Sequence, residues 1–176
     1  RPINYHLDAL KKLGMNYVLK DGYILAKSKG KLKGTTIKFP KISVGATENS
    51  IIAACLAEGV TILKNCAIEP EIKDLTNFLN SAGAKISWKG RVCKVIGVTS
   101  LNSTEYTVMA DRIEAGTFCI AATLAKGKLD IMNLDARIIN TELNLLKKFG
   151  AKVRVNKGKI SIKGPKIIKS VQNIKT

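Results

Sequence analysis

The residues with the clearest chemical potential lie in one run, Lys41-Ile42-Ser43-Val44-Gly45-Ala46-Thr47-Glu48-Asn49, which follows a strand-like stretch at 36–39 and opens a helical pattern. The N–H groups of a first helical turn lack partners inside the helix, so they attract anions such as phosphate. Ser43 and Gly45 keep the approach open, and Lys41 adds a positive charge. The run predicts a phosphate-binding turn. The alternative is a plain strand-to-helix turn, which is common in proteins.

A self-contained catalytic apparatus is not found in the sequence. His6 is the single histidine, and without a neighbouring nucleophile or acid such a residue is more often structural than catalytic. The spacing of Cys55, Cys66, Cys93 and Cys119 matches neither a C-x-x-C motif nor a metal site. Three of these cysteines lie inside apolar patterns, which predicts buried free thiols in a reducing cytoplasm. We therefore expect no metal site.

The charge balance is strongly basic, with 30 Lys and Arg against 13 Asp and Glu and a net charge of +17. This balance raises the alternative of a module that binds nucleic acid or an anionic surface. Only five of the basic residues are Arg, the lysines are dispersed, and no basic run is interleaved with aromatic residues. A solvated, lysine-rich surface is the preferred interpretation. No apolar run is long enough to predict a membrane span.

The sequence repeats itself at an interval of about 68 residues. Gly14, Gly83 and Gly150 each end an amphipathic helical pattern and are each followed by two strand patterns around a tight turn. The small-residue helix at 51–59 matches the one at 119–127. The repeating unit is strand, helix, strand, helix, strand, strand. We therefore predict an α/β fold built from the last part of one βαβαββ unit and two complete ones.

Periodicity and turn residues give approximate bounds for the elements. A candidate linker lies at 100–103 or at 109–110, and no element is expected from 165 to the end. The predicted helices begin near 6, 44, 71, 111 and 139 and end near 13, 58, 82, 125 and 149. The predicted strands are 16–20, 23–27, 36–39, 60–64, 85–88, 92–97, 105–109 and 128–132, with a last hairpin at 152–163.

Five ordered motifs, spread over the chain up to its tail, resemble the UDP-N-acetylglucosamine 1-carboxyvinyltransferase family, the enolpyruvyl transferases of peptidoglycan synthesis within the EPSP synthase-like superfamily. The sister enzymes of aromatic biosynthesis share the fold but are not expected to carry the last two motifs. The motifs are Arg1-Pro2-Ile3-Asn4-Tyr5-His6, Gly30-Lys31-Leu32-Lys33-Gly34, the run 41–49, Glu69-Pro70-Glu71-Ile72-Lys73-Asp74-Leu75 and Asp111-Arg112-Ile113-Glu114-Ala115-Gly116-Thr117-Phe118.

The resemblance implies a fold that explains the repeat. Members of the family form an inside-out α/β barrel of two domains, each with three βαβαββ units, and the active site lies in the cleft between the domains. By this resemblance, residues 1–109 are the later part of the first domain, and residues 110–176 are the first unit of the second. The barrel would then be incomplete within this chain.

The resemblance also implies a reaction and a set of site residues. The family transfers the enolpyruvyl group of phosphoenolpyruvate to the 3-hydroxyl of UDP-N-acetylglucosamine by addition and elimination, without a metal or cofactor. Arg1 matches an arginine that neutralises phosphate, and Glu69, Asp111 and Arg112 match positions at the cleft or in interdomain ion pairs. The implied substrate-binding residues are Arg1, Pro2, Ile3, Asn4, Tyr5, Lys41, Ile42, Ser43, Val44 and Gly45.

Some family features are absent from this chain. Asn4 and Tyr5 stand where Asp and Leu are usual, and the loop cysteine of the family belongs five residues before Arg1. The chain begins without Met, which suggests a piece of a longer protein. We therefore expect a cytoplasmic enzyme whose segment here holds no catalytic residue and is inactive without the rest of the protein. A non-catalytic relic is a further alternative.

Overall fold

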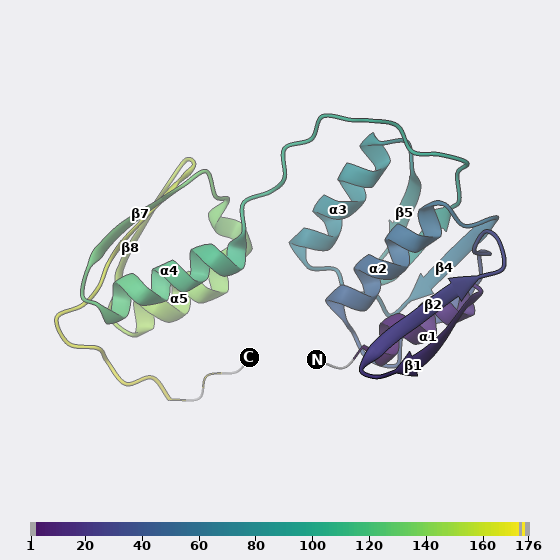
Figure 1. Cartoon of the computed structure of the whole chain (residues 1–176). Helices are drawn as coiled ribbons and strands as arrows, with labels where there is room; N and C mark the ends of the chain where they lie inside the picture. Colours follow the sequence, from purple (N-terminus) through teal and green to yellow (C-terminus); the bar gives the residue numbers. More distant parts are fainter. Residues whose placement is uncertain (1–2, 173, 175–176) are drawn as a thin grey trace. The chain divides into compact units, whose positions relative to one another are not determined.

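The computed structural model describes residues 3–172 and 174, and the chain divides into two compact units, 1–108 and 109–176. The first unit contains three helices, α1 (Asn4–Lys12), α2 (Val44–Cys55) and α3 (Pro70–Ser81) (Figure 1). Its strands are β1 (Met15–Lys20), β2 (Tyr23–Ser28), β3 (Thr36–Lys38), β4 (Val60–Lys64), β5 (Lys85–Lys89) and β6 (Val92–Ile96). These elements confirm the predicted α/β class for this unit.

The second unit contains α4 (Arg112–Leu124), the 3-10 helix η1 (Ala136–Ile139) and α5 (Asn140–Lys148). Its strands are β7 (Lys128–Met132), β8 (Lys152–Asn156) and β9 (Lys159–Lys163). Asp111 caps α4, since its Oδ1 accepts hydrogen bonds from the N–H groups of Ile113 at 2.7 Å and Glu114 at 3.0 Å. Asp135 caps η1 in the same way, a short helix that the sequence patterns did not predict.

The sheets confirm the internal repeat. In the first unit the strand order is β3-β4-β6-β5, with β3 parallel to β4 and the other pairs antiparallel. In the second unit the order β7-β9-β8 repeats the β4-β6-β5 part. The register repeats as well: Ile96 faces Val60 and Lys85, and Lys163 faces Lys128 and Lys152. The two-stranded antiparallel sheet β1-β2 corresponds to the β5-β6 pair and has no counterpart of β4.

Each unit has its own hydrophobic core. Phe39, Ile51, Leu63 and Ile72 are fully buried where α2 and α3 pack on the four-stranded sheet. Ile139, Leu143 and Ile160 are the corresponding large side chains between α4, α5 and the three-stranded sheet. The amphipathic helices bury one stripe each, as their periodicity predicted.

Two predictions about the elements are wrong. The helix predicted to end at Glu58 ends at Cys55, because the N–H and C=O of Glu58 bond to Leu32 and Gly34 instead of continuing the helix. The strand predicted at 105–109 does not form, and residues 101–110 carry no regular element. A strand needs a ladder partner for its backbone groups, and this segment is instead bonded to the side of α3.

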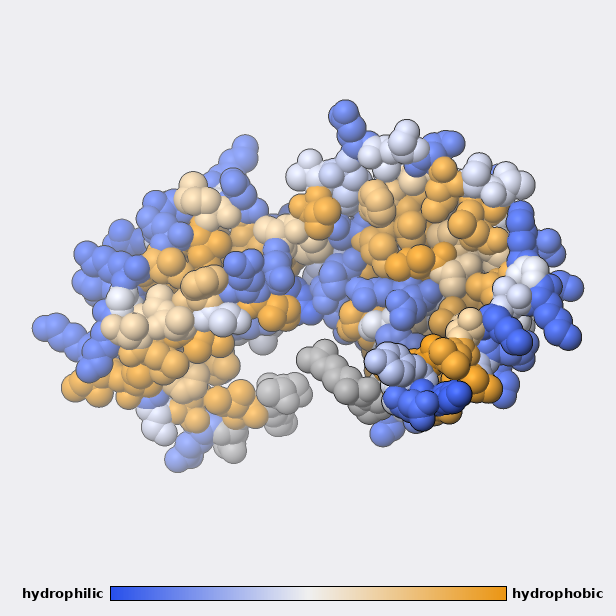
Figure 2. Space-filling model, in the orientation of Figure 1, coloured by the Kyte–Doolittle hydropathy of each residue, from blue (hydrophilic) through white to orange (hydrophobic). Residues whose placement is uncertain are grey.

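Helices α2 and α4 carry apolar side chains on the side that faces their own sheet and also on a side that is exposed. Ile52 on α2 and Leu56, the C-cap of that helix, are 50% and 47% exposed. Ile120 and Leu124 stand at the same repeat positions of α4 and are 47% and 61% exposed. Figure 2 shows apolar side chains gathered on this face of each unit. A helix that is apolar all round is typical of the interior of a larger protein.

We expect the isolated 176-residue chain to self-associate through these helices. Replacing Ile120 and Leu124 with Asn should raise the monomer fraction in sedimentation velocity without changing the far-ultraviolet circular dichroism. Lys64→Asn with Lys94→Asn, at exposed polar positions, serves as the control and should leave association unchanged. A clean wild-type monomer with a sharp cooperative melt would contradict the expectation.

The four cysteines are buried free thiols. Burial raises the pKa of Cys55 and of Cys66 to about 11, and burial also raises the pKa of Cys93 and Cys119. At pH 8 only about 0.1% of a thiol with pKa 11 is the reactive thiolate.

We therefore predict that the native chain reacts with a disulfide reagent at pH 8 at less than a hundredth of its rate in denaturant, where all four thiols should titrate quickly. Absorbance of the released thiolate measures both rates. Fast reaction of any one cysteine in the native chain would show that its burial is incomplete.

Candidate functional site

The turn between β3 and α2 has the geometry of an open helix N-terminus. Ser43 is the N-cap, in extended conformation, and its Oγ accepts a hydrogen bond from the N–H of Ala46 at 3.3 Å. Thr47 donates from Oγ1 to the carbonyl of Ser43 at 2.7 Å. The N–H groups of Val44 and Gly45 belong to the first turn, so the helix itself offers them no acceptor. The turn therefore presents backbone donors and the positive end of a helix dipole.

The first turn of α1 lies against this N-terminus. The ring nitrogen Nδ1 of His6 is 2.7 Å from Nδ2 of Asn49, one turn along α2 from the N-terminal residues. A Cβ added to Gly45 would lie 3.0 Å from Cε1 of His6, so the glycine is what allows the imidazole to lie over the turn. This contact between Asn49 and Nδ1 holds the ring in place, and the tautomer of His6 decides which of the two atoms donates.

Sequence reasoning missed this role of His6, because it judged the histidine by its sequence neighbours. The partners Gly45 and Asn49 are 39 and 43 residues away. The available signal was that His6 ends the first motif while Gly45 and Asn49 lie in the third. Only the packing of α1 on α2 shows that these two motifs meet.

The other predicted substrate-binding residues lie at the start of α1 and before α2. Ile3 is the N-cap of α1 and is 40% exposed, Asn4 is exposed, and Tyr5 packs partly into the core. Through His6 the structure therefore brings the start of α1 next to the Ser43–Gly45 turn. Lys41 and Ile42 are exposed beside that turn. Arg1 and Pro2 lie outside the described residues.

A second loop, between β4 and α3, is tied to the same end of α2. The N–H of Ala67 donates to Oγ1 of Thr47 at 3.1 Å. Glu69 occupies the N-cap position of α3 but makes no side-chain capping hydrogen bond. Its Oε2 atom is buried and has no hydrogen-bond partner among the described residues. A buried carboxylate oxygen is normally satisfied by a partner. The unsatisfied Oε2 atom is what we expect if Glu69 contacts a group outside the described part of the chain.

Acidic side chains also line this end of the first unit. The pKa of Glu48 is raised, mainly by partial burial and next by the nearby Glu71, while His6 acts in the opposite direction. Glu48 thus connects the first turns of α1, α2 and α3 electrostatically. The three helix starts form one cluster, which we call the helix-start cluster: His6, Ser43, Gly45, Glu48, Asn49, Glu69 and Glu71.

The remaining predicted cleft residues belong to the second unit. Asp111 acts as the cap of α4 described above, and Arg112 is the first residue of that helix. Both are therefore held at a helix start, as Glu69 is in the first unit. Among the described residues, no group of three or more His, Cys, Asp or Glu side chains is placed to hold a metal ion. No helix in the described part of the chain is long and apolar enough to cross a membrane.

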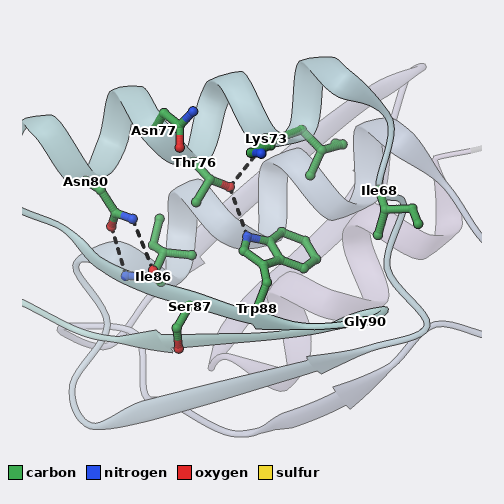
Figure 3. A pocket seen from close by; sticks show the side chains of 10 residues that line it. Ile68, Lys73, Thr76, Asn77, Asn80, Ile86, Ser87, Trp88 and Gly90 are labelled. Atoms are coloured by element: carbon green, nitrogen blue, oxygen red, sulfur yellow. Dashed lines mark hydrogen bonds between the residues drawn. The ribbon is translucent and has the colours of Figure 1, made fainter. Parts of the chain in front are cut away.

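A cavity of about 390 Å³ lies elsewhere, between α3 and β5 (Figure 3). Trp88 points from its strand toward the helix and donates from Nε1 to Oγ1 of Thr76 at 3.3 Å. The Asn80 amide is bonded to both backbone groups of Ile86. These polar groups are engaged within the wall, and none of the predicted site residues lines the cavity. The cavity is therefore separate from the candidate site.

Comparison with known sequences gives matches along the whole chain. Residues 1–176 match the profile of the EPSP synthase (3-phosphoshikimate 1-carboxyvinyltransferase) family. A UDP-N-acetylglucosamine 1-carboxyvinyltransferase of Pelagibacter ubique is 55% identical over 177 residues, which are 100% of this chain and 42% of that protein. The protein of that name from Rickettsia akari is 48% identical over 90% of this chain and 38% of its own length. The chain thus spans about two-fifths of these relatives.

Comparison with solved structures supports the fold. The enolpyruvyl transferase NikO from Streptomyces tendae superposes with a TM-score of 0.82 at 22% identity, over 94% of this chain and 43% of that one. An EPSP synthase from Acinetobacter baumannii superposes with a TM-score of 0.68 at 19% identity, over 97% of this chain and 41% of its own. The repeated units, the family profile and these superpositions lead to one conclusion: the chain belongs to the EPSP synthase family.

Proposed function

We propose that this chain is part of a cytoplasmic enzyme that transfers the enolpyruvyl group of phosphoenolpyruvate to the 3-hydroxyl of UDP-N-acetylglucosamine, the first committed step of peptidoglycan synthesis. The observation that carries the proposal is the identity of 42–55% to proteins named for this reaction, over most or all of this chain. The EPSP synthases share the fold at about 20% identity, so the sequence favours the sugar-nucleotide substrate.

The β3–α2 turn is the proposed nucleotide contact. The reaction brings two phosphorylated substrates together, so it needs sites for negative charge. The open N–H groups after Ser43, the dipole of α2 and the Lys41 ammonium all favour a diphosphate there. Lys41, Ile42, Ser43, Val44 and Gly45 would contact it mainly through the backbone, and the start of α1, from Arg1 to Tyr5, would hold the uridine.

The chemistry would proceed by addition and elimination. The sugar hydroxyl would lose its proton to a base as its oxygen adds to C2 of the enolpyruvyl group and C3 gains a proton from an acid; the loss of phosphate from C2 and of a C3 proton then restores the double bond. The residues described here would bind and orient the substrates, and the proton-transfer groups would come from elsewhere in the protein. Glu69, Asp111 and Arg112 would act at the cleft between the domains, of which 1–109 and 110–176 are the parts present.

Gly45→Ala in the full-length protein should raise the KM for the sugar nucleotide by roughly tenfold with a smaller change in kcat, because the methyl group displaces the His6 ring and narrows the turn. Steady-state phosphate release measures both constants. Gly116→Ala, at a helical glycine with no atom within 4 Å of the added Cβ, is the matched control and should leave both unchanged.

The steric cause of that loss can be checked with a second substitution. His6→Ala combined with Gly45→Ala should recover part of the affinity lost in Gly45→Ala, because the methyl group then has space. An unchanged KM in Gly45→Ala would overturn the assignment of the turn as the nucleotide contact.

The 176-residue chain alone should release no phosphate from phosphoenolpyruvate and UDP-N-acetylglucosamine above the blank, because catalysis needs all reacting groups held together. The full-length protein, assayed at the same concentration, should release phosphate only when both substrates are present. Turnover by the isolated chain would show that the groups needed for the reaction are all within it. Absence of turnover by the full-length protein with these substrates would refute the proposed function.

A further inference from the structure

The three-stranded sheet of the second unit has one covered face and one open face. Helices α4 and α5 pack against the sheet on one side (Figure 1). Successive side chains of a strand point to opposite faces, and Ile160 and Ile162 of β9 are buried under the helices. Ser161 and Lys163, which alternate with them, therefore belong to the outer face.

The register of the strands gathers basic side chains on this outer face. Lys163 of β9 faces Lys128 of β7 on one side and Lys152 of β8 on the other, and all three are exposed. Arg154 stands two residues after Lys152 on the same face and faces Ser161. Directly opposite side chains start about 5 Å apart, and like charges in such pairs destabilise a sheet. Four cations therefore share one small area at a cost to the free protein.

The acidic side chain of this face is engaged elsewhere. Asp130 of β7 is the one acidic residue in the three strands, and its Oδ2 lies 2.8 Å from Nζ of Lys159. Hydrogen bonds from Lys159 and Ser161 lower the pKa of Asp130, so it is ionised at neutral pH. Within the described part of the chain, no carboxylate forms an ion pair with the three lysines of the row or with Arg154.

The repeat shows that the fold does not require this row of lysines. In the first unit the equivalent row is Val60, Ile96 and Lys85, so two of the three positions are apolar. The lysines of the second unit are 24 and 11 residues apart in the sequence. They look dispersed along the chain, and only the pairing of β7, β9 and β8 brings them together.

The same side chains line a depression in the surface. It has a volume of about 430 Å³ and is open to solvent. Its lining includes the row of lysines, the neighbouring arginine and the polar residues beside them: Lys128, Asp130, Lys152, Arg154, Ser161 and Lys163. The cations therefore surround a space that a small molecule can enter.

The chemistry of the depression favours a compact anion with several phosphate groups. Lysine binds phosphate as a point charge, and the guanidinium of arginine can contact two phosphate oxygens at once. The row spans two strand spacings, roughly 10 Å, over which a short phosphate chain can meet several cations. The outward positions of the three strands hold no aromatic residue for stacking on a nucleobase, and Met132 is the one apolar residue there that could enter a lipid bilayer.

We propose that the outer face of this sheet binds a compact oligophosphate, such as inorganic triphosphate or the triphosphate group of a nucleotide, through Lys128, Lys152, Lys163 and Arg154. These four residues are called the basic patch. A bound oligophosphate would neutralise the repulsion between the facing lysines, which the free protein carries. The basic patch shares no residue with the helix-start cluster, so this inference does not rest on the proposed function.

The test is titration calorimetry of the full-length protein with inorganic triphosphate in metal-free buffer of low ionic strength. Lys163→Gln removes the central charge, and a triple variant combines it with Lys128→Gln and Lys152→Gln. Lys85→Gln is the matched control, because Lys85 holds the position of Lys152 in the first unit but lies in a row without other lysines. Lys41→Gln reports any binding at the proposed nucleotide turn.

The proposal expects Lys163→Gln to weaken triphosphate binding roughly tenfold, the factor that loss of a hydrogen bond to a charged group produces, and the triple variant to lose this binding. Lys163→Arg should retain it, because the charge is kept. Lys85→Gln and Lys41→Gln should match the wild type in this binding event. Sulfate, with a single charged group, should bind at least roughly tenfold more weakly than triphosphate.

Thermal unfolding gives a second readout that needs no activity. Without ligand and at low salt, Lys163→Gln should unfold at a higher temperature than the wild type, because a repulsion has been removed. Added triphosphate should raise the unfolding midpoint of the wild type and leave that of the triple variant unchanged. Metal-free ATP should act as triphosphate does, and a higher affinity for ATP than for triphosphate would identify a nucleotide as the source of the phosphate chain.

Three results would overturn the proposal. Equal affinity in the wild type and the triple variant would leave the basic patch as a solvated surface. An equal loss in Lys85→Gln or Lys41→Gln would trace the binding to overall charge or to the β3–α2 turn. Binding of a short DNA duplex or of phosphatidylglycerol vesicles that is lost in the triple variant, with no binding of triphosphate, would assign the patch to a macromolecular partner instead.

Discussion

The candidate site depends on one close approach, that of α1 to α2 over Gly45. A Cβ on Gly45 would lie only 3.0 Å from the His6 ring, so any larger residue at this position would have to displace that ring. The Asn49 amide fixes the ring from the other side. Because this contact joins two motifs that lie far apart in sequence, the start of α1 and the open turn before α2 become parts of one surface. Ser43 and Thr47 then order the turn itself.

The repeat places apolar side chains at the same exposed positions in both units of this chain. Helices α2 and α4 carry matching apolar positions on a side that their own sheets do not cover, as Ile52 and Ile120 illustrate. A side chain repeated at an exposed position in two units is explained most simply by a shared packing requirement. The chain spans about two-fifths of the length of its curated relatives.

The segment after β6 shows how local preference yields to available partners. Its alternation around Tyr106 favours a strand, yet the structure attaches it to α3 through hydroxyl, backbone and ring contacts. A strand gains stability from a neighbouring strand, whereas a tyrosine gains it from one carboxylate and one ring. In the described structure the second set of partners lies within reach, and the segment follows them.

The sequence by itself determined the α/β class, the internal repeat, most element positions and the family, because periodicity, caps such as Asp111 and motif runs are local features; the first strand of the second repeat, predicted at 105–109, does not form. It also located the turn at Ser43 as an open helix N-terminus, while its anion-binding role and the roles of the individual site residues are proposals. Only the tertiary structure decided that His6 lies over Gly45, that Oε2 of Glu69 is buried without a hydrogen-bond partner among the described residues, and that Tyr106 binds α3. These facts depend on contacts between residues tens of positions apart, and no local pattern encodes which side chains the packing of helices will bring together.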